Sequence, residues 1–394
     1  MNPRNYWADF VFRAVWRYKP GGFIPSLLQL EPGAGVRVWE VWNEPDSALF
    51  WSASVEDYVR LLKVAYLAIK QADPEARVMF GGLANEQHRN WLTDALEVIA
   101  QDPMRDVHGW YFDIMAVHNY SLALRTWQAV HDVRATLNAY GLSKPIWVNE
   151  SGVPAWDDYP GPTWASPDSP PPFQATMQEQ AAFVVQSAAY AFIAGAEVFF
   201  YHQLYDDCGN QPEATDFPPH DGALCEEGVL CWGDAHGLYR NPVDGPCFRQ
   251  HPEPGSPRPA LRAFQTLAAV FGAHPFEPVS LENRGADGLE TWITFRRPDT
   301  QERILVLWNR AGDPVDVEIA ATAHSATRYD MAGHVEEITP SAEGVYRLTL
   351  PAATNQTHPF APPTDPYAIG GAPYILVEHD PAGSSTARGA GGEG

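Results

Sequence analysis

Short apolar runs alternate with amphipathic segments along the first 270 residues of the chain. Apolar residues recur at helical spacing in segments that end near Pro or Gly, which predicts helices at 5–18, 54–73, 88–101, 124–140, 175–194 and 259–271. Brief apolar runs between these segments predict buried strands at 36–42, 78–82, 112–118, 145–150 and 198–202. Strands that alternate with helices indicate βαβ units and a parallel sheet.

The pattern changes to period two from about residue 275. Residues 291–295, 304–308 and 346–350 alternate apolar and polar side chains and are separated by turn residues, which predicts a small β-sandwich. Residues 380–394 are small and polar, which is typical of a disordered tail.

Polar side chains gather where the predicted parallel strands end. They are Asn43, Glu44, His118, Tyr120, Asn149, Glu150, Tyr201 and His202. A (β/α)8 barrel keeps its active site at this edge of the sheet. No glycine-rich phosphate loop follows any of the strands, which argues against a nucleotide-binding fold. We therefore predict an α/β chain with a TIM-barrel domain at 1–273, a β-sandwich at 274–379 and a tail at 380–394.

Two of these residues are strand-terminal glutamates that follow asparagine. Glu44 lies next to last in the run Val38-Trp39-Glu40-Val41-Trp42-Asn43-Glu44-Pro45, and Glu150 ends a second apolar strand. Either glutamate alone could be an acid that caps the next helix. Two such glutamates in one α/β chain form a pair of carboxylates that could face one cavity, which is the equipment for splitting a glycosidic bond.

The composition of the chain argues against several classes of binding partner. The chain has 26 basic and 49 acidic residues, a net charge of −23, so its surface repels nucleic acid and anionic membranes. No apolar run is long enough to span a bilayer, and the first residues have no secretory h-region. No Cys/His spacing suits a metal, so we expect neither a metal nor a cofactor.

All four cysteines fall within one forty-residue stretch, at Cys208, Cys225, Cys231 and Cys247. Two disulfides would indicate an oxidising compartment and hence an extracellular or cell-surface protein. Their pairing has three possible connectivities, and four free thiols are the alternative.

The motifs, taken in order, resemble a known family. Trp42-Asn43-Glu44-Pro45, Phe50-Trp51, the helix of Tyr58, Asp73-Pro74 and Gly81-Gly82 succeed one another as they do in TIM-barrel glycosidases. The chain resembles the retaining glycoside hydrolases of clan A, the 4/7 superfamily, and is most similar to the β-xylosidase and α-L-iduronidase family over about 36–272.

This resemblance implies roles for named residues. Glu44 would be the acid/base and Glu150 the nucleophile, while Asn43 would bind the sugar 2-hydroxyl. His118 would lie near the acid/base and Tyr120 near the nucleophile. Further substrate contacts would come from Trp147, Trp156, Tyr201 and His202, although Trp156 could equally pack its proline-rich loop. The implied activity is exo-acting hydrolysis of glycosides derived from plant or microbial polysaccharides, of β-xyloside type.

The start of the chain departs from the family pattern. If Glu44 ends strand four, strands one to three are missing, which is roughly a hundred residues at about 30 per βα unit. We therefore expect an N-terminally incomplete barrel, with 36–42 as an aggregation-prone edge strand. The alternative function is a non-catalytic carbohydrate-binding protein or an inactive truncated barrel. The sequence does not predict the sugar, the anomer or the oligomeric state.

Overall fold

A computed structural model describes residues 5–84, 88–120, 122–155, 157–158, 175–206, 224–226, 229–230, 235–240, 242, 253–355 and 367–379. The chain divides into two compact units, and each is described by itself. Unit 1 comprises Met1–Tyr120, Arg125–Ser151 and Ala194–Tyr201, and unit 2 comprises Ser121–Leu124, Gly152–Ile193 and His202–Gly394. The domain boundaries expected after residues 273 and 379 remain predictions.

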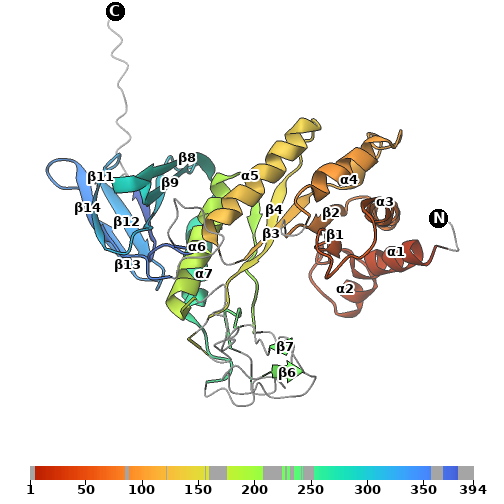
Figure 1. Cartoon of the computed structure of the whole chain (residues 1–394), viewed down its shortest axis with the longest axis horizontal. Coiled ribbons are helices and arrows are strands. Elements are labelled where there is room, and N and C mark those ends of the chain that lie inside the picture. The colour runs from red at the N-terminus through yellow and green to blue at the C-terminus, as the bar shows by residue number, and fades with distance from the viewer. Residues whose placement is uncertain are drawn as a thin grey trace, which may run out of the picture. The chain divides into compact units, whose positions relative to one another are not determined.

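Unit 1 alternates strands with helices (Figure 1). Its strands are β1 (Val38–Asn43), β2 (Arg77–Gly82), β3 (Met115–Tyr120), β4 (Ile146–Gly152) and β5 (Val198–Phe199). Its helices are α1 (Tyr6–Tyr18), α2 (Phe23–Leu27), α3 (Val55–Ala72), α4 (Trp91–Ala100), the short 3-10 turn η1 (Gly109–Tyr111) and α5 (Ala123–Ala139).

The strands of unit 1 follow one another in chain order. β1 pairs in parallel with β2, from Val38 opposite Arg77 to Asn43 opposite Gly82. Parallel bridges join Met79 to Ile114 and Leu83 to Val117, and thereby link β2 to β3. β3, β4 and β5 continue in that order, with β4 parallel to β5. Within the described residues β1 pairs on one side only.

Local sequence signals account for the first helices. Asn5 and Ser54 cap α1 and α3, because their side-chain oxygens accept hydrogen bonds from the N–H groups of Ala8 (3.1 Å) and Asp57 (3.2 Å). α1 lies along α3, where the indole of Trp7 donates to the carbonyl of Leu61 at 3.2 Å. The helices expected at 5–18 and from Ser54 are confirmed.

The sheet of unit 1 buries both of its faces. On one face Tyr58 of α3 packs edge-on against Phe80, and Phe80 against Phe112. The other face carries an apolar cluster of Met79, Ile114 and Ala116, with Val38 and Trp147 packed against it. Because side chains alternate along a strand, the neighbours Met79 and Phe80 of β2 point to opposite faces. Burial on both faces is what a parallel sheet requires.

Unit 2 contains two helices and mostly antiparallel strands within its described residues. The helices are α6 (Met177–Ile193) and α7 (Pro259–Phe271). The strands are β6 (Leu224–Glu226), β7 (Val229–Leu230), β8 (Glu277–Arg284), β9 (Glu290–Arg296), β10 (Arg303–Asn309), β11 (Val315–Ala320), β12 (Ser325–Asp330), β13 (Val335–Ile338), β14 (Val345–Leu350) and β15 (Tyr374–His379), and η2 (Ala286–Gly288) is a short turn.

The C-terminal strands form two sheets that share one core. The larger sheet has the order β13-β12-β15-β10-β9-β8, and β11 pairs with β14. Trp292 and Leu305 from the first sheet and Ile319, Tyr346 and Leu350 from the second belong to one buried cluster. The period-two pattern expected from residue 275 onward is therefore present as antiparallel strands.

Several expectations fall on other parts of the chain. Trp156, Cys208, Cys231, Cys247, the side chain of Cys225 and the tail 380–394 lie outside the described residues. The disulfides and the disordered tail thus stay predictions. The fifth strand is shorter than expected, because β5 pairs only with Trp147 and Val148 and ends at Phe199. Across the described part of the chain, the helices are too short or too polar to cross a membrane.

Candidate active site

Glu44 occupies a strained turn directly after β1. Its backbone N–H donates to the carbonyl of Gly82 at 3.0 Å, and its φ is +41°. Trp42 also has a left-handed backbone, with φ of +74°, and its indole donates to the carbonyl of Phe50 at 3.0 Å. Non-glycine residues in this region cost about 1–3 kcal/mol each and cluster at functional sites. The turn directs the Glu44 side chain toward β3.

His118 of β3 lies between the two glutamates. Its Nδ1 is 2.8 Å from Oε1 of Glu44 and 3.7 Å from Oε2 of Glu150. The imidazole is 1% exposed, whereas the glutamate side chains are 14% and 27% exposed. A single buried ring therefore touches both carboxylates, while each carboxylate keeps access to solvent.

Glu150 of β4 is held from the other side by Tyr120. The Tyr120 hydroxyl donates a hydrogen bond to Oε1 of Glu150. One oxygen of Glu44, one of Glu150 and a ring nitrogen of His118 all lie within 4.8 Å of one another. The ends of β1, β3 and β4 thus bring the two predicted carboxylates to one place.

Charge at this place favours a protonated His118. Burial alone would lower the pKa of His118, but the hydrogen bond to Glu44 and the charges of Glu150, Glu44 and Glu40 outweigh burial. The pKa of His118 is therefore raised above its ordinary value. A cationic imidazole here partly neutralises a group of carboxylates that would otherwise repel one another.

The locations of His118 and Tyr120 agree with the expected ones, beside Glu44 and Glu150 respectively. Asn43 ends β1 opposite Gly82, and its amide has no hydrogen-bond partner among the described residues. Trp147 packs on the apolar cluster beneath the strand ends, which favours a packing role. The catalytic and substrate-binding roles of these residues stay predictions.

Two further predicted contacts come from the segment after β5. Tyr201 is half-buried and is the last residue of unit 1. His202 belongs to unit 2, where its ring lies 5.6 Å from the ring of His236. Both residues stay predicted substrate contacts.

Sequence reasoning missed two residues at this site. Oε1 of Glu40 accepts from the N–H of Gly82 at 2.8 Å, and Oε2 accepts from the amide of Asn149 at 3.0 Å. A Cβ on Gly82 would lie 2.0 Å from Nε2 of His118, so only glycine leaves room for the imidazole. The signal for Glu40 was available, because a charge inside an apolar strand normally has a specific partner.

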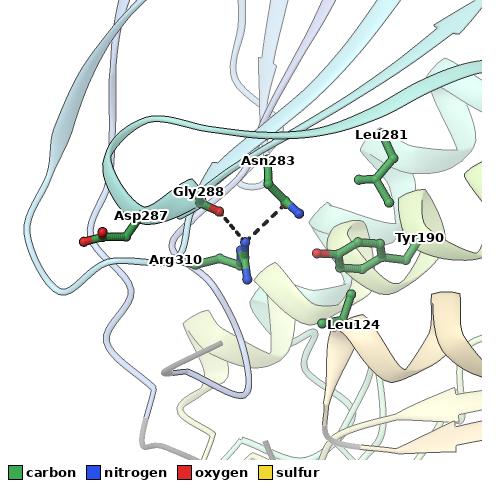
Figure 2. A pocket seen from close by; sticks show the side chains of 7 residues that line it. All are labelled: Leu124, Tyr190, Leu281, Asn283, Asp287, Gly288 and Arg310. Carbon is green, nitrogen blue, oxygen red and sulfur yellow. Dashed lines mark hydrogen bonds between the residues drawn. The ribbon is translucent and has the colours of Figure 1, made fainter. Parts of the chain in front are cut away.

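Unit 2 has a separate cavity of about 320 Å³ (Figure 2). The guanidinium of Arg310 donates to Oδ1 of Asn283 at 3.2 Å and to the carbonyl of Gly288 at 2.6 Å. The cavity is lined by Leu124, Tyr190, Leu281, Asn283, Asp287, Gly288 and Arg310. None of the predicted site residues is among them.

Two glutamates at the ends of parallel strands β1 and β4, brought close to each other, form an arrangement that glycoside hydrolases also use. Residues 35–203 match the model of Glycosyl hydrolases family 39. The chain is 26% identical to a β-xylosidase of Caldicellulosiruptor saccharolyticus over 297 residues, which are 72% of this chain and 51% of that protein. A β-xylosidase of Geobacillus stearothermophilus is 30% identical over 104 residues, 25% of this chain and 19% of the relative. The chain thus spans about half the length of the first relative.

Solved structures give the same fold. A glucosidase from Croceicoccus marinus superposes with a TM-score of 0.54 at 14% identity, covering 95% of this chain and 74% of the other. An α-L-arabinofuranosidase from Thermotoga maritima gives 0.53 at 12% identity, covering 96% and 74%. The chain thus shares its fold with two solved glycosidases, and the match of residues 35–203 to a glycosyl hydrolase family agrees with the resemblance inferred from the glutamate motifs.

Proposed function

We propose that this chain hydrolyses O-glycosidic bonds by a retaining double displacement. The observation that carries the proposal is the approach of Glu44 and Glu150, since one carboxylate oxygen of each lies within 4.8 Å of the other. Retaining glycosidases keep their two carboxyl groups about 5–5.5 Å apart, whereas inverting enzymes leave a wider gap for water. The short gap therefore supports retention.

The two glutamates have different neighbours, which supports different roles. Glu150 accepts a hydrogen bond from the Tyr120 hydroxyl. Its carboxylate would attack the anomeric carbon and form a covalent glycosyl ester. Glu44, less exposed and beside His118, would protonate the leaving oxygen as the C–O bond breaks. Glu44 would then take a proton from water, which attacks the anomeric carbon and releases Glu150. Asn43, whose amide is available, would bind the sugar 2-hydroxyl.

In this proposal β1 to β5 correspond to strands four to eight of a (β/α)8 barrel, and the C-terminal sheets form a β-sandwich. Sheet order supports the first part, because the two glutamates end β1 and β4, which are three places apart. The core shared by the two C-terminal sheets supports the second. An experimental structure with Glu44 and Glu150 on adjacent strands would contradict the correspondence.

The proposed substrate is a small β-xyloside-like glycoside attacked from its end. The two β-xylosidases among the relatives support this choice, as does a site built from polar side chains at strand ends. An extracellular or cell-surface location is part of the same proposal. Proteolytic accessibility of the protein on intact host cells would test the location.

Hydrolysis of a panel of nitrophenyl glycosides by the full chain tests the activity. We expect β-xyloside turnover, its loss in Glu150→Gly by about 10⁴-fold or more, and partial rescue by azide. The rescued product should be a glycosyl azide of inverted anomer. Glu75→Gly, which alters an exposed turn between α3 and β2, should match the wild type.

The alternative is a carbohydrate-binding protein without turnover. The single-sided pairing of β1 within the described residues favours it, because an open sheet edge weakens the support of Glu44. If the wild type binds xylosides in calorimetry but releases no nitrophenol from nitrophenyl glycosides, this alternative is established and the proposed hydrolysis is contradicted.

A further inference from the structure

Glu40 joins three strands at the carboxylate site. It lies in β1, four residues before Glu44, within an otherwise apolar run. Oε1 accepts from the backbone N–H of Gly82 in β2 at 2.8 Å. Oε2 accepts from Nδ2 of Asn149 in β4 at 3.0 Å. Each of its oxygens therefore binds a group from a different strand.

Both partners of Glu40 adjoin the proposed machinery. Gly82 lies against the His118 ring so closely that a Cβ would meet Nε2 at 2.0 Å. Asn149 directly precedes Glu150 in β4. A displacement of either partner would therefore move a group that touches the glutamates.

The acceptor-only character of a carboxylate sets the orientation of the Asn149 amide. Glu40 can accept but cannot donate, so Asn149 must turn its NH2 group toward Glu40. Its Oδ1 consequently faces the other way, where it is buried without a hydrogen-bond partner among the described residues. An amide in place of Glu40 would remove this constraint.

We propose that Glu40 is a positioning residue of the glycosidase site. Its two hydrogen bonds hold the Gly82 backbone beside His118 and the Asn149 amide before Glu150. The kinetic part of this proposal rests on the proposed function, whereas the geometric part does not. Glu40 has no described hydrogen bond to Glu44 or Glu150, so it positions them through Gly82 and Asn149, and its charge acts in addition on His118.

The electrostatic surroundings agree with this geometry. Three carboxylates, Glu44, Glu150 and Glu40, act on His118, and each of them raises its pKa. Burial raises the pKa of Glu40 although its side chain keeps solvent access, while the bonds from Gly82 and Asn149 and the charge of His118 oppose the rise. Removal of the Glu40 charge should therefore lower the pKa of His118.

The first test needs no activity. Glu40→Gln has nearly the same shape, but only one of its two terminal atoms can accept a hydrogen bond. Its NH2 group would face either the N–H of Gly82 or the NH2 group of Asn149 as donor against donor. We expect the Asn149 amide signals to shift in ¹⁵N NMR spectra of the full chain, and the His118 titration to move to lower pH. Unchanged Asn149 signals and an unchanged His118 midpoint would overturn the proposal.

A matched control distinguishes a specific effect of Glu40 on the site from a general effect on the stability of the fold. Asp113 also links strand ends through its carboxylate, since Oδ2 accepts from the N–H of Val78 at 2.8 Å and pairs with Lys70 at 2.9 Å. Asp113→Asn should reduce stability in urea and leave the His118 midpoint where it is. An equal shift of the midpoint in both variants would show that Glu40 has no specific role.

The second test is kinetic. Glu40→Gln should lower kcat on a β-xyloside by about 10- to 100-fold, because small displacements of reacting groups have effects of this size. Asn149→Ala removes the partner, so a further Glu40→Gln change should cost much less than it does alone. Losses that simply multiply in the double variant would contradict the coupling. If the wild type shows no turnover, the proposed function fails and the NMR result still decides the role of Glu40.

Discussion

Nδ1 of His118 lies 2.8 Å from Oε1 of Glu44, and this contact ties the third strand of unit 1 to the end of the first. The imidazole is almost fully buried, and its Nε2 faces Gly82. The position of the proposed acid/base therefore depends on a histidine whose own position depends on a glycine of the intervening strand.

The protonation of His118 should make stability depend on pH. Its pKa in the folded protein is raised above 6.5, so the folded state holds its proton more tightly than the unfolded state. The resulting stabilisation is fully present below pH 6.5 and is lost as pH rises through the folded pKa. Urea unfolding of the wild type and His118→Asn from about pH 5 to about pH 9 measures it. A difference in unfolding free energy that grows with pH would contradict the assigned sign.

Gly82→Ala should displace the His118 ring. The added Cβ would lie 2.0 Å from Nε2, and the ring is enclosed and cannot move without losing its contact with Glu44. We expect loss of β-xyloside hydrolysis by about 100-fold or more and an altered His118 signal in NMR spectra. Gly141→Ala is the control, since its Cβ meets nothing although its φ is +68°. That variant should lose stability and keep the His118 signal.

Tyr120→Phe should slow catalysis more than it weakens folding. The hydroxyl donates to the carboxylate of Glu150, and a hydrogen bond to a charged group contributes about 1.5–3 kcal/mol. Without it kcat should fall about 10- to 100-fold, provided that the bond is stronger in the transition state. Steady-state kinetics and the pH profile measure the effect. An unchanged kcat would exclude Tyr120 from the orientation of the nucleophile.

Tyr58→Phe should destabilise the protein without touching the carboxylates. The buried hydroxyl accepts from the N–H of Gly81 at 2.9 Å and donates to the carbonyl of Val41 at 3.3 Å. Its loss leaves two buried backbone groups unpaired and should lower the unfolding free energy by about 1–3 kcal/mol. Tyr140→Phe, which loses only a 3.5 Å contact with Thr93, should change little. Similar losses in both variants would refute this account.

Arg310 should support the turn between β8 and β9 in unit 2. Its buried guanidinium bonds Asn283 and the carbonyl of Gly288 (Figure 2), next to Asp287, whose φ is +57°. Arg310→Met should therefore lower the unfolding free energy by about 1–3 kcal/mol. Arg284→Met, at an exposed ion pair with Glu282, should cost less than about 1 kcal/mol. Thermal unfolding of the two variants gives the comparison.

Local patterns predicted much of unit 1. The helical spacing and caps at Asn5 and Ser54 place α1 and α3 within a residue or two, since capping is decided by neighbours in the chain. The Asn-Glu motifs at Glu44 and Glu150 indicated the two carboxylates that the structure brings together, because each motif ends an apolar strand. The period-two pattern likewise indicated the antiparallel strands that follow α7.

The partners across strands could not be predicted in the same way. In the sequence Glu40 is a single charge within an apolar strand. Its partners Gly82 and Asn149 lie 42 and 109 residues away along the chain. The sequence does not distinguish Gly82 from other glycines at strand ends. Its contact with His118 is visible only in the structure. The sequence by itself determined the elements and the reactive residue types, because these depend on short-range periodicity and intrinsic chemistry. Only the tertiary structure decided which groups meet, because contacts between distant residues depend on strand order and register, which no local pattern encodes.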